Sequence, residues 1–335
     1  FDRMLDEFLQ GCRSEGDENG SDSEEDGTRN SSDCETFVSP VTSGDGAGIE
    51  IGLDRLTGLK SVKTKLESYQ KVMRFNRQRI DAGLSALKMP LHSMFLGAPG
   101  TGKTTVARMM GKMLAQSGML SRGHVVECER ATLIGTCYGS AEEATRKALD
   151  DARGGVLFID EAYQLQSDDS RDPGRMVIES LMTALADEAN RDWMLILAGY
   201  PDEMRRLFDL NPGLKSRIPE SNIYTFDSLT ETELMEVAER YLDGNDYVLA
   251  GESREVLLRR VSADFGSRDR SFGNARHIIN LIQTEVIPAM AMRVTSTDTV
   301  ADVRLLSEIL PCDIPETSVE PRAARRSIGY RWDGL

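Results

Sequence analysis

The sequence is poor in the residues that build metal centres and disulfide frameworks. It has three histidines and five cysteines in 335 residues. The cysteines are scattered along the chain as Cys12, Cys34, Cys128, Cys137 and Cys312, and no two form a C-x-x-C pair. An odd, scattered set is typical of reduced thiols in a cytosolic protein. The sequence therefore predicts a cytoplasmic location and no cysteine or histidine metal site.

Long apolar runs and an excess of positive charge are also missing. No run approaches the roughly 20 apolar residues that cross a bilayer, and no signal peptide is recognisable, so no membrane span is expected. The chain has 40 Lys or Arg against 55 Asp or Glu, a formal net charge of −15. A protein that tracks nucleic acid needs a basic stripe to displace counterions. Nucleic acid is not expected as a partner, although the total charge leaves room for a local basic channel.

The negative charge is concentrated at the start of the chain. Residues 1–47 contain thirteen Asp or Glu and only three Arg. Residues 11–47 are mainly Gly, Ser, Asp and Glu, the composition of a solvated segment, and we assign 1–50 as an acidic, largely disordered N-terminal segment. Before it, Phe1, Met4, Leu5, Phe8 and Leu9 would share one face of a short amphipathic helix. Two interpretations stay open for residues 1–9: the frayed end of a preceding element, or a docking peptide.

From about residue 52 the pattern alternates between strands and helices, which indicates a parallel sheet covered on both faces. Strands are predicted over 91–96, 124–129, 156–159, 193–198 and 222–226. Helices are predicted over 57–82, 103–117, 140–152, 174–189 and 201–210. We therefore expect an α/β domain over 51–227, with a doubly wound, five-stranded parallel sheet.

After residue 227 the strand signal ends. Helices are predicted over 230–242, 253–265, 272–293 and 301–309, which make a small all-helical domain over 228–315. Residues 316–335 are short of apolar side chains and include four arginines, at 322, 325, 326 and 331. They are assigned as a basic C-terminal tail, either a solvated tail or a site for an acidic partner.

A complete phosphate-binding loop follows the first predicted strand. It comprises Gly97, Ala98, Pro99, Gly100, Thr101, Gly102, Lys103, Thr104 and Thr105. The glycines let consecutive N–H groups point at phosphates, Lys103 adds a positive charge, and the Thr104 hydroxyl is placed to bind Mg²⁺. The loop also opens a helix, whose positive dipole end favours anions. The sequence predicts ATP and Mg²⁺ as cofactors.

Two adjacent carboxylates follow the strand predicted over 156–159. Asp160 lies where the Mg²⁺ of a doubly wound sheet needs an anion. Glu161 leaves the same strand end and can polarise the attacking water, a contribution of about 10²- to 10⁴-fold. The alternative is an exposed acidic turn, and the preceding phosphate loop favours the functional interpretation.

Two arginines are candidates to neutralise charge in the transition state. Arg217 precedes the last predicted strand, and Arg276 begins a helix of the second domain. Such arginines supply about 10³- to 10⁵-fold when they reach the γ-phosphate. A lone arginine is otherwise an ordinary surface ion-pair residue, and the sequence leaves that alternative open for both.

Six segments in this order resemble the AAA+ ATPases, in the branch of the red-type Rubisco activases and the stage V sporulation protein K-like ATPases. They are 53–62, 97–105, 155–163, 197–200, 211–217 and 273–276. The resemblance runs from Gly52 to Pro315. It implies an AAA+ P-loop domain followed by a helical lid, and it makes the segment 53–59 the adenine-side wall. By the same resemblance Arg217 is an arginine finger that reaches a neighbouring subunit, and Arg276 is a sensor-2 arginine.

Members of this branch form hexameric rings that use ATP hydrolysis to pull a protein client through a central pore. The resemblance therefore implies a homo-oligomer, a client of unknown identity and an aromatic pore loop. Tyr138 is the candidate pore residue, although its position is shifted by one relative to the family pattern. The alternative is a tyrosine packed at a helix start. A nucleotide-dependent switch or scaffold with little turnover is the second functional hypothesis, and a DNA-handling AAA+ ATPase is the third.

Replacing Lys103 by Ala should abolish nucleotide binding, because the point charge at the phosphates is lost. Titration of the purified variant with a fluorescent ATP analogue measures this directly. An unchanged affinity would contradict the assignment of the phosphate loop.

Overall fold

The computed structural model describes residues 56–85, 87, 89–135, 140–167, 169, 171–187, 192–270, 272–296 and 302–316. The predicted acidic segment 1–50, the tail from residue 317 onward and the candidate pore residue Tyr138 lie outside these ranges. The described residues divide into two compact units. One contains 56–233 together with Arg270–His277, and the other contains 234–269 and 278–316. Each unit is considered by itself.

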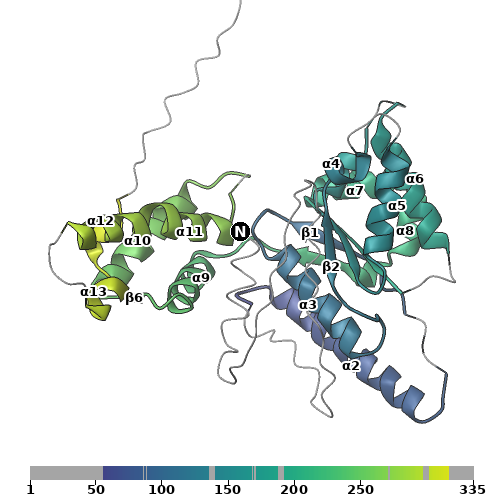
Figure 1. Ribbon diagram of the computed structural model, residues 1–335, viewed down its shortest axis with the longest axis horizontal. Helices are drawn as coiled ribbons and strands as arrows, with labels where there is room; N and C mark the ends of the chain where they lie inside the picture. The colour runs from purple at the N-terminus through teal and green to yellow at the C-terminus, as the bar shows by residue number, and fades with distance from the viewer. Residues whose placement is uncertain are drawn as a thin grey trace, which may run out of the picture. The chain divides into compact units, whose positions relative to one another are not determined.

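A five-stranded parallel sheet forms the centre of the first unit (Figure 1). Its strands are β1 (Ser93–Gly97), β2 (Val125–Cys128), β3 (Val156–Ile159), β4 (Met194–Gly199) and β5 (Ile223–Phe226). They lie in the order β2-β3-β4-β1-β5, and every pairing is parallel. The predicted doubly wound α/β fold is confirmed, because crossover helices cover both faces of such a sheet.

Alternate residues of the strands build two separate apolar cores. Phe95 points into the core shared with α2 (Lys60–Asp81) and α3 (Lys103–Gln116), whereas Met94 and Leu96 point into the opposite core. The opposite core is closed by α4 (Arg130–Ile134), α5 (Ala141–Asp151), α6 (Pro173–Ala186), α7 (Pro201–Leu210) and α8 (Pro212–Arg217). Figure 1 shows these two sets of helices on opposite sides of the strands. Burial on both faces explains why each strand reads as a short continuous apolar run.

The predicted helices of this unit form where they were expected, and two short helices were not predicted. Helices α6 and α7 each begin with a proline, whose missing N–H costs nothing in a first turn. Asp172 caps α6 by accepting a hydrogen bond from the Gly174 N–H at 2.7 Å. The unpredicted helices α4 and α8 have five and six residues, too few to show a helical period in sequence.

The second unit is mainly helical, as predicted, and also contains a small parallel ladder. Its helices are α9 (Glu231–Asp243), α10 (Ser253–Gly266), α11 (Ala275–Leu281), α12 (Ile287–Thr295) and α13 (Val303–Ser307), of which α9 and α11 begin with residues of the first unit. The predicted helix 301–309 ends early, because β7 (Glu308–Ile309) pairs with β6 (Val248–Leu249). A π-helical turn over Ile282–Val286 interrupts the predicted helix 272–293. It lies just before Pro288, which has no N–H to donate to a carbonyl one turn earlier.

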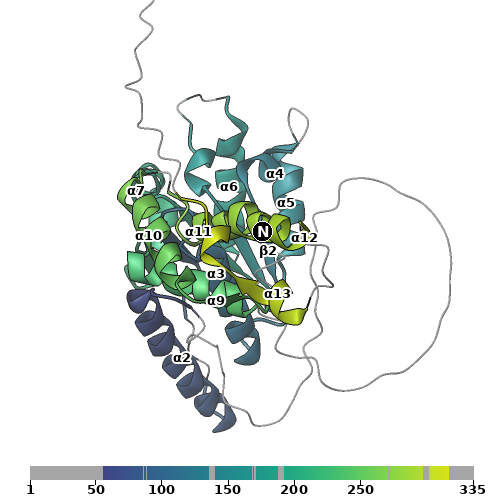
Figure 2. The same ribbon diagram turned by 90° about the vertical axis from the view of Figure 1, so that its left-hand side faces the viewer.

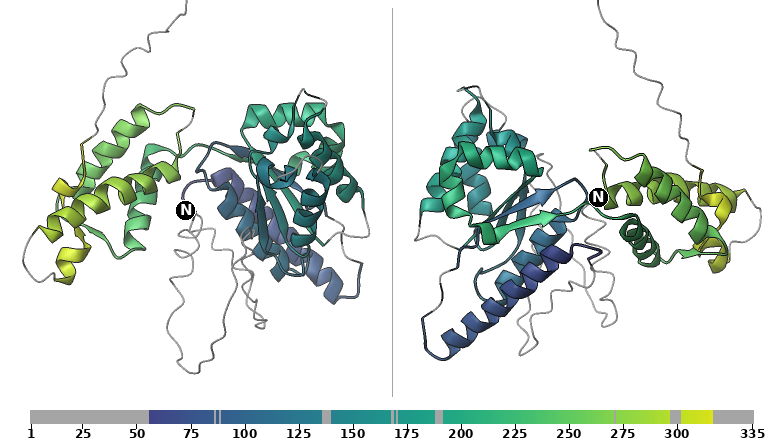
Figure 3. Two further views of the ribbon diagram at one scale, coloured as in Figure 1. Left: turned by 45° about the horizontal axis from the view of Figure 1, so that its top comes forward. Right: turned by 180° about the vertical axis from the view of Figure 1, so that it is seen from behind.

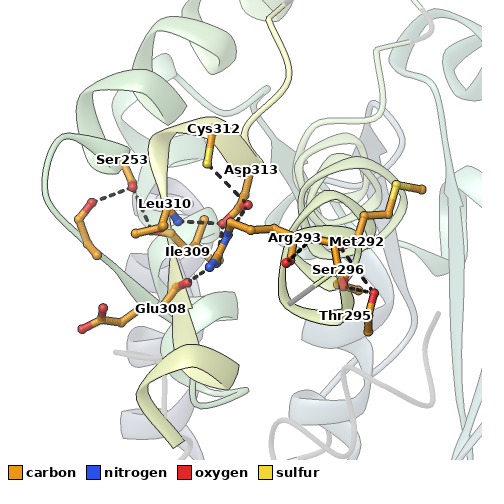
Figure 4. A network of polar contacts seen from close by, with 12 residues as sticks. Ser253, Met292, Arg293, Thr295, Ser296, Glu308, Ile309, Leu310, Cys312 and Asp313 are labelled. Atoms are coloured by element: carbon orange, nitrogen blue, oxygen red, sulfur yellow. Dashed lines mark hydrogen bonds and ion pairs between the residues drawn. The ribbon is translucent and has the colours of Figure 1, made fainter. Parts of the chain in front are cut away.

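A buried ion pair joins α12 to the end of this unit (Figure 4). Arg293 donates from Nε to Asp313 Oδ1 at 2.7 Å and from Nη2 to Asp313 Oδ2 at 2.8 Å. Arg293 Nη2 also donates to the carbonyl of Glu308 at 2.9 Å, and the Leu310 N–H donates to Asp313 Oδ2 at 2.8 Å. The hydrogen bonds to Asp313 raise the pKa of Arg293. Asp313 is 1% exposed, so its charge depends on these donors.

No helix in the described part of the chain has both the length and the apolar character needed to cross a bilayer.

Arg293→Met should destabilise the second unit by about 3 kcal/mol, because it leaves the Asp313 carboxylate buried without its partner. Arg304→Met is the matched control: Arg304 pairs with Glu308 at 2.6 Å, but its side chain is 78% exposed, and such pairs contribute about 0–1 kcal/mol. Urea unfolding followed by circular dichroism compares the two variants. Equal losses of stability would contradict the importance assigned to the buried pair.

Candidate functional site

The phosphate loop connects β1 to α3 and is held in shape by its glycines. Gly97 ends β1, and a Cβ there would lie 2.5 Å from the carbonyl oxygen of Phe226 on β5. Gly100 and Gly102 have φ angles of +66° and +91°, in the region that favours glycine. A Cβ on Gly100 would overlap the carbonyl of Gly273. At these positions the fold accepts only glycine without rearrangement.

The first turn of α3 has the chemistry of an anion site. Gly102 precedes the helix, no side chain caps its N–H groups, and no acidic residue lies in the first turn. These N–H groups and the helix dipole can bind phosphate oxygens. Thr104 and Thr105 are half-buried in this turn, and Thr101 is buried with its hydroxyl donating to the Ala98 carbonyl at 2.8 Å. The loop therefore fits a nucleotide phosphate chain.

Lys103 lies at the centre of the predicted site residues. It is 9% exposed, and its Nζ donates to the carbonyls of Gly97 at 3.1 Å and Ala98 at 3.0 Å. The pKa of Lys103 is lowered, mainly by burial and also by the positive charge of Arg276. The negative charges of Asp160 and Glu161 act in the opposite direction. Asp160, Glu161 and Arg276 therefore each lie within electrostatic reach of Lys103.

Asp160 and Glu161 follow β3 directly. The Asp160 N–H donates to the Cys128 carbonyl on β2 at 3.0 Å, and Asp160 Oδ1 accepts a hydrogen bond from the Glu161 N–H at 3.0 Å. Glu161 has a φ of +47°, an uncommon conformation for a residue with a side chain and one that is found at functional sites. In the described residues, no three His, Cys, Asp or Glu side chains gather as a metal cluster. Thr104 and Asp160 carry oxygen atoms of the kind that Mg²⁺ prefers as ligands.

A short 3₁₀ turn (Ala162–Leu165, η2) after Glu161 holds its carboxylate. Gln164 Nε2 donates to Glu161 Oε2. Arg130, the first residue of α4, donates from Nη1 to the Gln164 carbonyl at 2.6 Å and from Nη2 to Asp172 Oδ1 at 2.8 Å. Burial of Asp172 acts to raise its pKa, but hydrogen bonds from Arg130 and the Gly174 N–H outweigh this effect, so the pKa is lowered. Arg130 thus ties this turn to the start of α6. The sequence analysis did not identify Arg130 or Gln164.

Two tyrosines lie beside Glu161. The ring centroids of Tyr163 and Tyr200 are 6.2 Å apart. Burial raises the pKa of both phenols, and the negative charge of Glu161 is the next largest cause in each case. Both phenols therefore resist ionisation more than an exposed tyrosine would, and Glu161 is one of the causes. Neither tyrosine was assigned a role from the sequence. Tyr163 follows β3 and Tyr200 follows β4, and only the pairing of these strands brings the two segments together.

The segment Gly273–Arg276 is bonded to the phosphate loop. Asn274 is 1% exposed; its Nδ2 donates to the Pro99 carbonyl at 3.0 Å, and its Oδ1 accepts from the Leu229 N–H at 3.0 Å. The Ala275 N–H donates to the Gly100 carbonyl at 3.1 Å. These bonds place Arg276, which is exposed, where its charge acts on Lys103. Asn274 was not singled out from the sequence, where the Gly273-Asn274 pair was the available turn signal. In the structure Asn274 has a φ of +45°.

Arg217, the other predicted arginine, makes no hydrogen bond or ion pair with the described residues of this group. It is half-buried at the end of α8, and its Nη1 donates to the Gly213 carbonyl on the same helix at 3.1 Å. Among the described residues Arg217 has no ion-pair partner.

The described part of the predicted adenine-side wall lies beside the loop. Leu59 is buried with a φ of +54°, and its Cδ1 would be 3.6 Å from a Cβ on Gly102. Residues 53–55 of this segment are outside the described ranges.

Comparisons with known proteins agree with this geometry. Residues 93–220 match the model of the AAA family, "ATPase family associated with various cellular activities", and residues 230–324 match the AAA lid domain. The chain is 36% identical to stage V sporulation protein K of Bacillus subtilis (strain 168), over 82% of this chain and 84% of that protein. It is 38% identical to the chloroplastic ribulose bisphosphate carboxylase/oxygenase activase of Cyanidioschyzon merolae, over 69% and 78%. It is 37% identical to CbbX of Cereibacter sphaeroides, over 80% and 85%.

Solved structures support the fold alone. The FIGL-1 AAA domain in complex with ADP aligns with a TM-score of 0.51 and 17% identity, over 81% of this chain and 87% of that one.

A parallel α/β sheet with a phosphate loop, followed by a helical lid, defines a P-loop ATPase. The chain belongs to the AAA ATPase family, in the branch with stage V sporulation protein K and CbbX, and it is an enzyme that hydrolyses ATP. The resemblance and the fold class inferred from the sequence are confirmed.

Asn274→Ala should weaken ATP binding by about 5- to 150-fold, because it removes a buried hydrogen-bonding group that positions the loop. Asn274→Asp should weaken binding at least as much as Asn274→Ala, since it keeps the acceptor for Leu229 but places a buried carboxylate against the carbonyl oxygens of Pro99 and Phe272. Asn280→Ala is the control, because Asn280 is exposed on the adjoining helix. Equilibrium binding of a fluorescent ATP analogue gives the three affinities, and equal affinities for all would contradict the bridging role of Asn274.

Proposed function

We propose that this ATPase assembles into a homo-hexameric ring and uses Mg²⁺-dependent ATP hydrolysis to remodel or translocate a protein client. The site supports a division of roles. Lys103 and the N–H groups of the phosphate loop bind phosphates. Thr104 and Asp160 would hold Mg²⁺, which would supply positive charge to the phosphate oxygens. Glu161 accepts a proton from the attacking water, and Arg276 stabilises negative charge from the lid side.

The observation that carries the ring proposal is the difference between the contacts of Arg276 and those of Arg217. Arg276 acts on Lys103 electrostatically and is tethered by Asn274 and Ala275, whereas the hydrogen bond of Arg217 stays within α8. An arginine finger needs to reach the γ-phosphate. We therefore assign Arg217 to the nucleotide of a neighbouring subunit, which makes each active site complete only in an assembly.

A route from a client to the active site also supports remodelling. The candidate pore residue Tyr138 follows α4 in sequence, and α4 begins with Arg130. Because Arg130 donates to the Gln164 carbonyl, a pull on the loop after α4 would reach the turn that holds Glu161. One relative is named as an activase of another enzyme, a kind of activity that a remodelling ATPase performs. We leave the client of this chain unnamed.

We further propose 51–227 and 228–315 as the two domains, with Gly273–Arg276 contributed back to the phosphate loop.

A cytoplasmic location stays a prediction from the scattered cysteines. A nucleotide-dependent switch with little turnover is the alternative function, and it predicts sites that do not depend on assembly.

ATP turnover per subunit should rise with protein concentration, because assembly supplies the missing arginine. In Arg217→Ala it should be about 10³-fold or more below wild type at every concentration, with nucleotide affinity unchanged. Arg206→Ala is the control, since Arg206 is exposed on the neighbouring helix α7. Turnover that depends neither on concentration nor on Arg217 would favour the switch.

A further inference from the structure

Arg130, the first residue of α4, joins three elements of the first unit. Its guanidinium group donates from Nη1 to the Gln164 carbonyl in η2 at 2.6 Å, and from Nη2 to Asp172 Oδ1 at the start of α6 at 2.8 Å. Figure 2 shows α4 beside α6, and Figure 3 shows the same teal helices from two further directions. The planar fork of a guanidinium reaches two acceptors at once, in a fixed geometry that a lysine does not reproduce.

The fold shelters the ion pair of Arg130 and reserves space for it. The side chains of Arg130 and Asp172 are 23% and 16% exposed. Asp172 Oδ1 also accepts a hydrogen bond from the Gly174 N–H at 2.7 Å, so one oxygen holds both groups. A Cβ on Gly174 would lie 2.6 Å from Arg130 Nη1 and 2.4 Å from the Leu165 carbonyl oxygen. The absence of a side chain at Gly174 therefore lets the guanidinium group and η2 approach the start of α6.

The turn that Arg130 holds also holds the candidate base. Gln164 Nε2 donates to Glu161 Oε2, and the Gln164 side chain is also hydrogen-bonded to the Tyr163 phenol. Tyr163 lies against the end of β4, where a Cβ on Gly199 would be 2.8 Å from its Cδ1. Glu161 has a φ of +47°, a conformation that persists only when the surrounding structure supports it. The orientation of the Glu161 carboxylate therefore depends on the shape of η2.

We propose that Arg130 is a positioning residue for ATP hydrolysis and acts on Glu161 through Gln164. The inference rests on the proposed role of Glu161 as the base that accepts a proton from the attacking water. A general base needs to lie within hydrogen-bonding reach of that water, and a displacement of about 1 Å costs about 10²-fold in rate. Neither described hydrogen bond of Arg130 goes to the phosphate loop. Loss of Arg130 therefore slows hydrolysis and leaves ATP binding unchanged.

Arg130→Met should lower the kcat of ATP hydrolysis about 10- to 100-fold at unchanged ATP affinity. Arg130→Lys should be intermediate, because it keeps the charge and loses the fork. Arg108→Met is the matched control: Arg108 pairs with Glu127 at 2.5 Å with side-chain exposures of 22% and 33%, and its loss should leave kcat near wild type. Turnover at saturating ATP and equilibrium binding of a fluorescent ATP analogue separate the two effects. Equal kcat values for Arg130→Met and Arg108→Met would overturn the proposal.

Gln164→Met tests the same route and leaves the ion pair of Arg130 intact. Gln164 is exposed, so its replacement should not disturb folding, and methionine keeps the length of the side chain without its donor. The kcat of this variant should fall about tenfold. The double variant Arg130→Met/Gln164→Met should be no slower than the slower single variant, because both changes break one route to Glu161. A wild-type kcat for Gln164→Met, or single effects that multiply in the double variant, would rule out this route.

Glu161→Gln distinguishes a failure of this inference from a failure of the proposed function. If Glu161→Gln hydrolyses ATP at the wild-type rate, Glu161 is not the base, and the positioning role falls with it. If Glu161→Gln stalls, single-turnover hydrolysis of radiolabelled ATP compares it with Arg130→Met/Glu161→Gln. We expect equal residual rates, because Arg130 then has no base to position. A further drop as large as that caused by Arg130→Met alone would show that Arg130 acts independently of Glu161, and the inference would be wrong.

Discussion

The contact between the phosphate loop and the Gly273–Ala275 backbone is the constraint on which the active site depends. Gly100 has no side chain, so the Gly273 carbonyl can lie against it, and the Ala275 N–H reaches the Gly100 carbonyl. Asn274 completes the join by bonding to Pro99 and Leu229. A segment more than 170 residues away in sequence is thereby made part of the loop that holds phosphate. Arg276 follows directly, so these backbone contacts bring its backbone next to the phosphate loop.

The sheet supplies the remaining geometry. Parallel strands end at one edge, so β1 delivers the loop, β3 delivers Asp160 and Glu161, and β4 delivers Tyr200 to the same edge. Lys103 is buried among these groups, and its lowered pKa reflects a balance between desolvation and two carboxylates. The arrangement brings the proposed phosphate-binding, metal-binding and base residues of one chain to the same edge. It leaves Arg217 on α8, which is why we propose that a neighbouring subunit completes the site.

Much of the fold could be predicted from the sequence, because buried parallel strands read as apolar runs and the phosphate loop has a local pattern. The carboxylates after β3 could be identified for the same reason, since strand order places them near the loop. Asn274, Arg130 and Tyr200 could not, because their roles come from contacts with residues distant in sequence. The pairing of Val248 with Glu308 was missed likewise, since two-residue strands have no period.

The most direct test of this account is amide hydrogen exchange of the full chain with and without Mg²⁺ and a slowly hydrolysed ATP analogue. The account predicts that peptides covering 97–105 and 273–277 become protected together, at the same nucleotide concentration, because they are one bonded unit. Protection of the loop without the second peptide, or of neither, would contradict the claim that Asn274 joins the lid-side segment to the phosphate site.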